Sequence, residues 1–160
     1  EIMPSLVGSE MCIRDRYRSA YEKENLPVRE SLIYHGDYTI QGGVRGIEKL
    51  VADNPDMTAV FVTNYEMTMG AVIGMNELDL KIPEQLSMIG FDNLQFARAC
   101  SPKLTIVAQP TSGIAREVAS IMLKRLGEAE SEETEPITEK LGAEIIMGKS
   151  VRVLKEKENS

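Results

Sequence analysis

The sequence has little of what most enzymatic and metal chemistry requires. It contains a single His, two Cys and no Trp among 160 residues. With His35 as the only imidazole, a Ser-His-Asp or Cys-His site would have to be built around it, and no Gly-x-Ser-x-Gly elbow accompanies it. These residues also cannot supply the clustered nitrogen and sulfur ligands that zinc sites use. We therefore expect no catalytic residue, no metal site and no cofactor.

Long apolar runs and excess positive charge are also missing. No apolar run approaches the roughly 20 residues that span a bilayer, and no stretch resembles a secretory leader. A formal net charge of −7 speaks against this chain wrapping nucleic acid by itself, because phosphate contacts need clustered Lys and Arg. We expect a folded cytoplasmic domain with no membrane contact, and any DNA-binding role must lie outside this stretch.

The first sixteen residues form a segment of their own. The string from Ser5 to Arg16 resembles translated sequencing-adapter read-through, so residues 1–16 are predicted to be non-native. A short, genuine N-terminal arm is the alternative. Without this segment Cys12 disappears and Cys100 is the only thiol, and we read both cysteines as thiols rather than as a disulfide.

From Tyr17 onward, apolar runs and helical spacing alternate along the chain. The pattern predicts helices over 17–25, 41–52, 65–78, 94–100 and 112–126, and strands over 31–35, 58–62, 86–91 and 104–108. The strand over 58–62 is expected to be buried on both faces. Residues 128–139 read as an acidic surface loop, and 143–147 with 150–154 as a terminal strand pair. The fold class expected is α/β, a doubly wound parallel sheet with helices on both faces.

Polar side chains follow the predicted strands at the points where they end. Tyr38, Asn64, Asp92 and Gln109 hold these positions. In an open α/β sheet the crevice beyond the carboxyl ends of the strands is where ligands bind, so these side chains are expected to converge. An aromatic face with several hydrogen-bonding groups suits a sugar ring or a purine. The alternative is that such residues cap the next helix or form a turn, and Asp92 is one such candidate.

A cluster of glycines opens the predicted helix over 41–52. Gly42, Gly43 and Gly46 have the wrong spacing for a Walker or a Rossmann phosphate loop. We interpret them as a close approach of loop and helix.

Several segments carry a family resemblance. Residues 62–71, 81–93 and 104–110 look like the effector-binding domain of LacI/GalR-type bacterial transcription regulators, and the Ile-Pro-Glu…Gly-Phe-Asp-Asn block within 82–93 is the most specific. Residues 35–39 resemble the family's loop with an aromatic ligand platform. The resemblance implies a periplasmic-binding-protein type I fold, of which this chain holds a flavodoxin-like half. It also implies that Tyr38 stacks on the effector while Asn64, Asp92 and Gln109 hydrogen-bond to it, and that Met69 and Cys100 lie toward a dimer partner.

Two positions depart from the family pattern. Asn64-Tyr65 stands where the family usually has Asn-Asp, which points to a subgroup with its own effector preference. Ile13 stands where the family's ligand-binding Arg is expected, so no Arg is assigned to the site.

The resemblance also implies a domain organisation truncated at the N-terminus. Residues 17–108 would form an incomplete C-terminal subdomain, 109–154 a return segment belonging to the other subdomain, and 155–160 a disordered tail. The intact protein would be a cytoplasmic homodimer that senses a sugar or nucleobase and binds operator DNA through a headpiece outside this chain. The runner-up is a periplasmic sugar-binding protein of an ABC transporter. An enzyme on a flavodoxin-like fold ranks last.

Overall fold

The computed structural model describes residues 4–127 and 137–153, with side chains from Ile13 onward. These residues form two compact units that divide between Tyr34 and His35. Most of the acidic stretch expected over 128–139 and the tail expected over 155–160 lie outside the described residues.

The first unit is a helix followed by a single short turn of 3₁₀ helix. Helix α1 spans Pro4–Lys23 and the turn η1 spans Glu30–Leu32. Arg18 and Glu30 join the two through an ion pair of 2.6 Å. The strand predicted over 31–35 is therefore wrong. A strand is stable only beside another strand, and none in the described part of the chain pairs with these residues.

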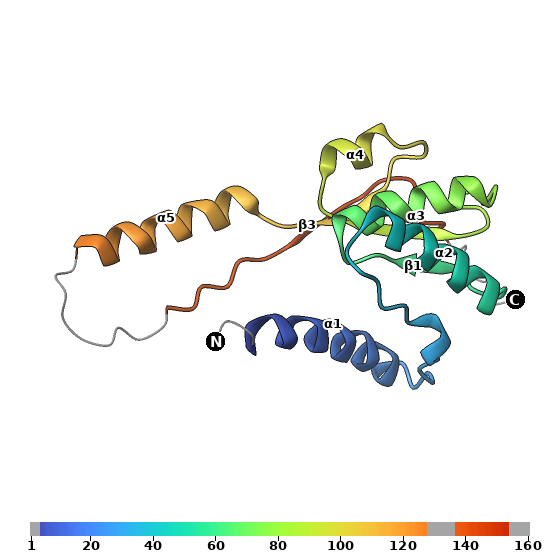
Figure 1. The fold of residues 1–160 in the computed structure, drawn as a ribbon, viewed down its shortest axis with the longest axis horizontal. Helices are drawn as coiled ribbons and strands as arrows, with labels where there is room; N and C mark the ends of the chain where they lie inside the picture. Colours follow the sequence, from blue (N-terminus) through green and yellow to red (C-terminus); the bar gives the residue numbers. More distant parts are fainter. Residues whose placement is uncertain (1–3, 128–136, 154–160) are drawn as a thin grey trace, which may run out of the picture. The chain divides into compact units, whose positions relative to one another are not determined.

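The second unit contains a four-stranded sheet in the order β1-β2-β3-β4 (Figure 1). The strands are β1 (Ala59–Phe61), β2 (Ser87–Phe91), β3 (Thr105–Ala108) and β4 (Glu144–Ile146). The helices are α2 (Ile40–Asp53), α3 (Tyr65–Glu77), α4 (Leu94–Ala99) and α5 (Thr111–Gly127). The strands β1, β2 and β3 are parallel and are joined by α3 and α4, which confirms the predicted α/β organisation.

The end of the chain departs from the predicted terminal strand pair. Strand β4 pairs with β3 in antiparallel register, and residues 150–153 form no strand. Ser150 instead bonds to two strands of the sheet. Its carbonyl oxygen accepts a 2.8 Å hydrogen bond from the Met88 backbone N–H, and its hydroxyl oxygen accepts a 2.8 Å hydrogen bond from the Thr105 backbone N–H. A single residue thus joins β2 to β3, which local sequence pattern does not reveal.

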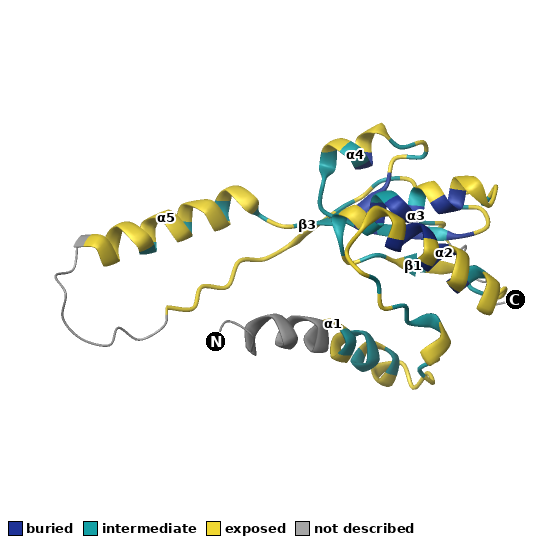
Figure 2. Ribbon diagram, viewed as in Figure 1, coloured by how far each residue is buried: buried dark blue, intermediate teal, exposed yellow. Residues whose placement is uncertain are grey.

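The core lies where α2 and α3 pack on each other and α3 packs on the sheet (Figure 2). Its largest fully buried apolar side chains are Ile47, Met75, Met88 and Ile106. Strand β1 is less buried than predicted, since Phe61 remains 52% exposed. This strand is at the edge of the sheet, so only part of its surface is covered.

Helix α5 carries an uncovered apolar surface. Val118, Met122, Leu123 and Leu126 are between 50% and 80% exposed, whereas apolar side chains at helical spacing normally face a core. In the described residues, no helix combines the length and apolar character needed to cross a membrane.

Candidate functional site

The carboxyl ends of the three parallel strands bring three of the predicted site residues into one row. Phe61 on β1 is level with Ile89 on β2, and Phe91 on β2 is level with Val107 on β3. Continuing this register places Asn64 level with Asp92, and Gln109 one position further along the next strand. The three residues therefore follow their strands at the carboxyl end of the sheet, where Gln109 is hydrogen-bonded to Asp92 and Asn64 is linked to the end of β2 through Thr68.

Asp92 and Gln109 are joined by two hydrogen bonds at the carboxyl ends of β2 and β3. One carboxylate oxygen of Asp92 accepts a 2.9 Å hydrogen bond from the Gln109 backbone N–H, and the other accepts one of 2.7 Å from Gln109 Nε2. The backbone N–H of Asp92 also donates to the Val107 carbonyl at 2.8 Å, so β2 and β3 stay paired up to this point.

The helix that follows β2 is capped by Asn93, not by Asp92. Asn93 Oδ1 accepts a 2.9 Å hydrogen bond from the Phe96 backbone N–H at the start of α4. Asp92 and Asn93 both have positive φ, 53° and 45°, a region that Asp and Asn enter more readily than most residues. The alternative role of Asp92 as a helix cap is thereby excluded, and its carboxylate faces Gln109.

Asn64 does act as a helix cap, in line with the alternative interpretation. Its Oδ1 accepts a 3.0 Å hydrogen bond from the Met67 backbone N–H at the start of α3. Its carbonyl oxygen accepts a 2.7 Å bond from the Thr68 hydroxyl. That hydroxyl oxygen in turn accepts from the Phe91 backbone N–H at 3.3 Å, which joins α3 to the end of β2. Capping uses only the amide oxygen of Asn64, so its Nδ2 group can still donate to a ligand.

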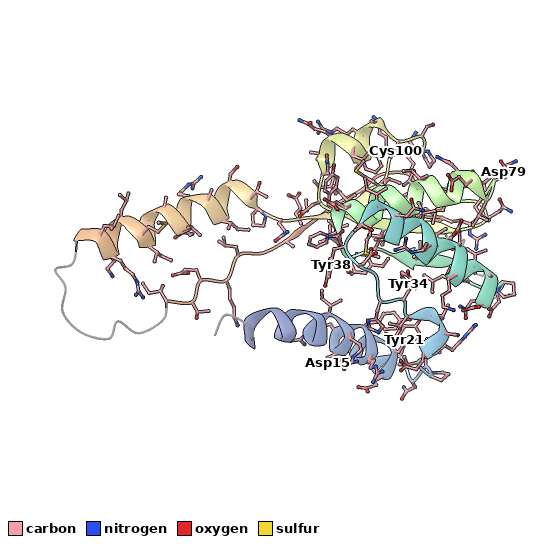
Figure 3. The ribbon with its side chains drawn as sticks, viewed as in Figure 1. Asp15, Tyr21, Tyr34, Tyr38, Asp79 and Cys100 are labelled. Atoms are coloured by element: carbon pink, nitrogen blue, oxygen red, sulfur yellow. The ribbon has the colours of Figure 1, made fainter. Side chains whose placement is uncertain are left out.

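Tyr38 lies in a loop that is held by a polar cluster just ahead of α2 (Figure 3). The Asp37 carboxylate accepts hydrogen bonds from the Thr39 hydroxyl at 2.7 Å, the Thr39 backbone N–H at 3.2 Å and Arg45 at 2.6 Å. The two bonds from Thr39, with the smaller effect of the Arg45 charge, hold the pKa of Asp37 below its ordinary value of 3.8. Tyr38 has a φ of 61° and is 53% exposed, so a strained backbone presents its ring at the surface.

Glycines of α2 and α3 allow these two helices to approach each other closely. A β-carbon on Gly43 would overlap the carbonyl oxygen of Met67, and one on Gly70 would overlap that of Ile40. A β-carbon on Gly42 would likewise overlap the carboxylate of Asp37. The predicted approach was between a loop and the helix; the contacts at Gly43 and Gly70 instead bring the N-terminal halves of α2 and α3 together, while Gly42 lies against Asp37 of the loop.

The remaining candidates lie elsewhere in the second unit. Met69 on α3 is partly buried. Cys100, just after α4, is a free thiol packed against the core, and its burial raises its pKa. Their place at a dimer interface stays a prediction. His35 is exposed, and in the described residues no group of three or more His, Cys, Asp or Glu side chains could hold a metal ion.

A groove of about 360 Å³ lies outside this strand-end site. Its lining comes from α5 together with Glu139 and Leu141, and it includes none of the four predicted effector residues. Sequence reasoning missed the cluster of Asp37, Thr39 and Arg45 as well as the cap at Asn93. The Asp37-Tyr38-Thr39 string before a helix was the available signal for the cluster, because Asp and Thr commonly bond to a nearby backbone.

Comparisons with known proteins agree on the type of domain. Residues 9–151 match the model of a periplasmic binding protein-like domain. The chain is 37% identical over 108 residues to catabolite control protein A of Priestia megaterium, covering 68% of this chain and 32% of that protein. It is 34% identical over 110 residues to the transcriptional repressor PurR of Yersinia pestis, covering 69% and 32%. The chain thus spans about a third of the length of these curated relatives.

Solved structures of regulators have a similar fold. The complex of the transcriptional regulator CelR with cellobiose superimposes with a TM-score of 0.75 and 30% identity, covering 84% of this chain and 40% of that one. A LacI-family regulator from Enterococcus faecium with bound ribose has a TM-score of 0.74 and 29% identity, covering 87% and 50%. The family match begins inside residues 1–16, whose non-native origin remains a prediction.

Proposed function

Because the chain belongs to the periplasmic binding protein-like family, we propose that it is part of the effector-binding domain of a LacI-type transcription regulator. The curated relatives described above are regulators of transcription, which favours this function over sugar uptake by a transporter or an enzymatic reaction. The proposal assigns no catalytic step and no cofactor to the chain.

The observation that carries the proposal is the row of polar groups at the strand ends. Asp92 supplies a negative acceptor that Gln109 Nε2 holds by a hydrogen bond, and Asn64 Nδ2 supplies donors. Tyr38 adds an exposed aromatic face for stacking. Hydroxyl groups of a sugar, or the polar edge of a nucleobase, need this mixture of donors and acceptors around a flat apolar surface. The bound cellobiose and ribose of two structural relatives support a sugar as the first choice.

The mechanism proposed for the intact protein is allosteric. An effector that binds between two subdomains would shift a homodimer between two arrangements and so change the affinity of its headpieces for operator DNA. The net charge of −7 is consistent with DNA contacts made by a different part of a cytoplasmic protein. Met69 and Cys100 are proposed to lie toward the dimer partner.

The experiment that tests this function is a ligand screen on the protein expressed from its full reading frame. Calorimetry would measure the binding of ribose, cellobiose, other sugars, adenine and guanine, and a fluorescence assay would measure operator affinity with and without the ligand found. We expect one ligand class to bind and to change operator affinity. A protein that binds none of these compounds, or whose DNA affinity no bound ligand alters, would contradict the proposal.

A further inference from the structure

The Asp92 carboxylate lies just beyond the carboxyl end of β2, where a charged side chain would ordinarily be mobile. The residue is only partly buried, and Gln109, its partner, is exposed. Yet each of its two oxygens accepts one hydrogen bond from the same residue, Gln109. Two bonds from one partner, one to each oxygen, fix the plane of the carboxylate and not only its position.

The backbone at this point requires such support. Asp92 and Asn93 are consecutive non-glycine residues with positive φ, a conformation that persists only when neighbouring interactions hold it. Asn93 is held by its cap on α4. Asp92 is held by Gln109 and by its own backbone bond to Val107.

The hydrogen-bond partner of Asp92 is an uncharged amide, that of Gln109, and this matters for ligand recognition. An Arg or Lys at position 109 would also fix the carboxylate, but it would neutralise the charge that a ligand hydroxyl or N–H recognises. An amide donates hydrogen bonds without cancelling that charge. A carboxylate has about four acceptor positions, so the two bonds from Gln109 leave one on each oxygen for a ligand.

We propose that Gln109 is a positioning residue that acts through Asp92. Its Nε2 group and backbone N–H hold the Asp92 carboxylate in one orientation before any ligand arrives. This inference rests on the proposed function, because it takes Asp92 as a group that hydrogen-bonds to the effector. Preorganisation of this kind raises affinity because the ordering of the acceptor precedes binding.

The test uses six variants of the protein expressed from its full reading frame, of which Asp92→Asn and the double variant Gln109→Met/Asp92→Asn serve only in the affinity measurement. Gln109→Met keeps the length of the side chain but removes its donor, and Gln109→Glu places an acceptor against Asp92. The double variant Gln109→Glu/Asp92→Asn restores a donor and an acceptor with their places exchanged. Gln85→Met is the matched control, because Gln85 also makes an exposed side-chain bond, to the Lys81 backbone N–H, but precedes β2 instead of following β3.

The first measurement needs no ligand. Three-bond NMR couplings between Hα and Hβ report whether residue 92 occupies one χ1 rotamer or an average of several. We expect one rotamer in the wild type, in Gln85→Met and in the exchanged double variant, and averaging in Gln109→Met and Gln109→Glu. A single rotamer in Gln109→Met would overturn the proposal, because the backbone bond alone would then suffice.

The second measurement is the affinity for the sugar or nucleobase that the wild type binds. We expect Gln109→Met to weaken binding about tenfold, and we expect this loss to vanish when Asp92 is already replaced by Asn. An equal loss in both backgrounds would show that Gln109 contacts the ligand independently and would overturn the proposal. If the wild type binds none of the probes, the proposed function fails while the rotamer measurement still decides the role of Gln109.

Discussion

The hydroxyl of Ser150 donates a 2.6 Å hydrogen bond to the carbonyl oxygen of Met88, across 62 residues of sequence. The same hydroxyl oxygen accepts from the Thr105 backbone N–H, and Ser150 and Met88 are both fully buried. The end of the described chain therefore holds together β2 and β3, the two strands that Asp92 and Gln109 directly follow.

Replacing Ser150 by Ala is expected to lower the free energy of unfolding by about 1–3 kcal/mol, because the buried Thr105 N–H loses its acceptor. Urea denaturation followed by circular dichroism measures the change. Ser112→Ala, at an exposed position of α5, is the control and should stay within about 0.5 kcal/mol of the wild type. Equal stabilities for the two variants would contradict the role given to Ser150.

Gly70→Ala is expected to destabilise the protein by about 1–3 kcal/mol, because the added methyl group would overlap the Ile40 carbonyl and separate α2 from α3. The midpoint of urea unfolding reports the change. The control is Gly113→Ala on α5, where the nearest atoms would lie 3.7 Å from the new β-carbon. That substitution should be neutral or stabilising, since Ala is the better helix former. Similar destabilisation by both would argue against the close helix contact.

The pKa of Asp37 should depend more on Thr39 than on Arg45. The Thr39 hydroxyl is the main cause of its lowered pKa, and the Arg45 charge contributes less. In an NMR titration of the Asp37 carboxyl carbon, Thr39→Val should therefore raise the pKa more than Arg45→Gln does. A larger shift in Arg45→Gln would contradict this order.

The sign of the pH dependence follows from the same lowered pKa. Asp37 binds its proton less readily in the folded protein, so it stabilises the fold above pH 3.8, the ordinary pKa. This contribution is lost as the pH falls from about 3.8 through the lower folded value. Acid unfolding of Asp37→Asn should consequently depend less on pH in this range than that of the wild type. Parallel acid-unfolding curves for the two proteins would contradict the linkage.

The exposed face of α5 should make these 160 residues aggregate when they are expressed by themselves. Leu123 and Leu126 are 71% and 80% exposed. Replacing both by Lys should raise the monodisperse fraction measured by size-exclusion chromatography with light scattering. The matched control adds two Lys residues at Ala115 and Ser120, which are exposed positions of the same helix. If the control improves solubility as much, the added charge and not the apolar face is responsible.

The sequence predicted those elements whose signal is local. The helical spacing of Val44, Ile47 and Leu50 indicated α2, and short apolar runs indicated β1, β2 and β3. The prediction over 31–35 was wrong because β-propensity does not form a strand without a neighbour to pair with. The partner of β4 and the role of Ser150 depend on contacts between distant segments, which local patterns do not contain.

The candidate site could likewise be predicted only in part from the sequence. The ends of apolar runs located Asn64, Asp92 and Gln109 at one edge, because parallel strands share a direction. The sequence did not distinguish the cap from the acceptor in Asp92-Asn93, since both residues suit either role. Backbone φ and the position of Gln109 decide between them.

The most direct test of the central claim is the affinity of Asp92→Asn for the effector, measured by calorimetry on the protein from the full reading frame. Asn tolerates the positive φ at this position but lacks the charge, so folding should be retained. Asp53→Ala, which removes an exposed ion pair with Lys49, serves as the control. We predict that Asp92→Asn weakens binding at least tenfold while the control binds as the wild type does. An unchanged affinity in Asp92→Asn would contradict the placement of the effector at the strand ends.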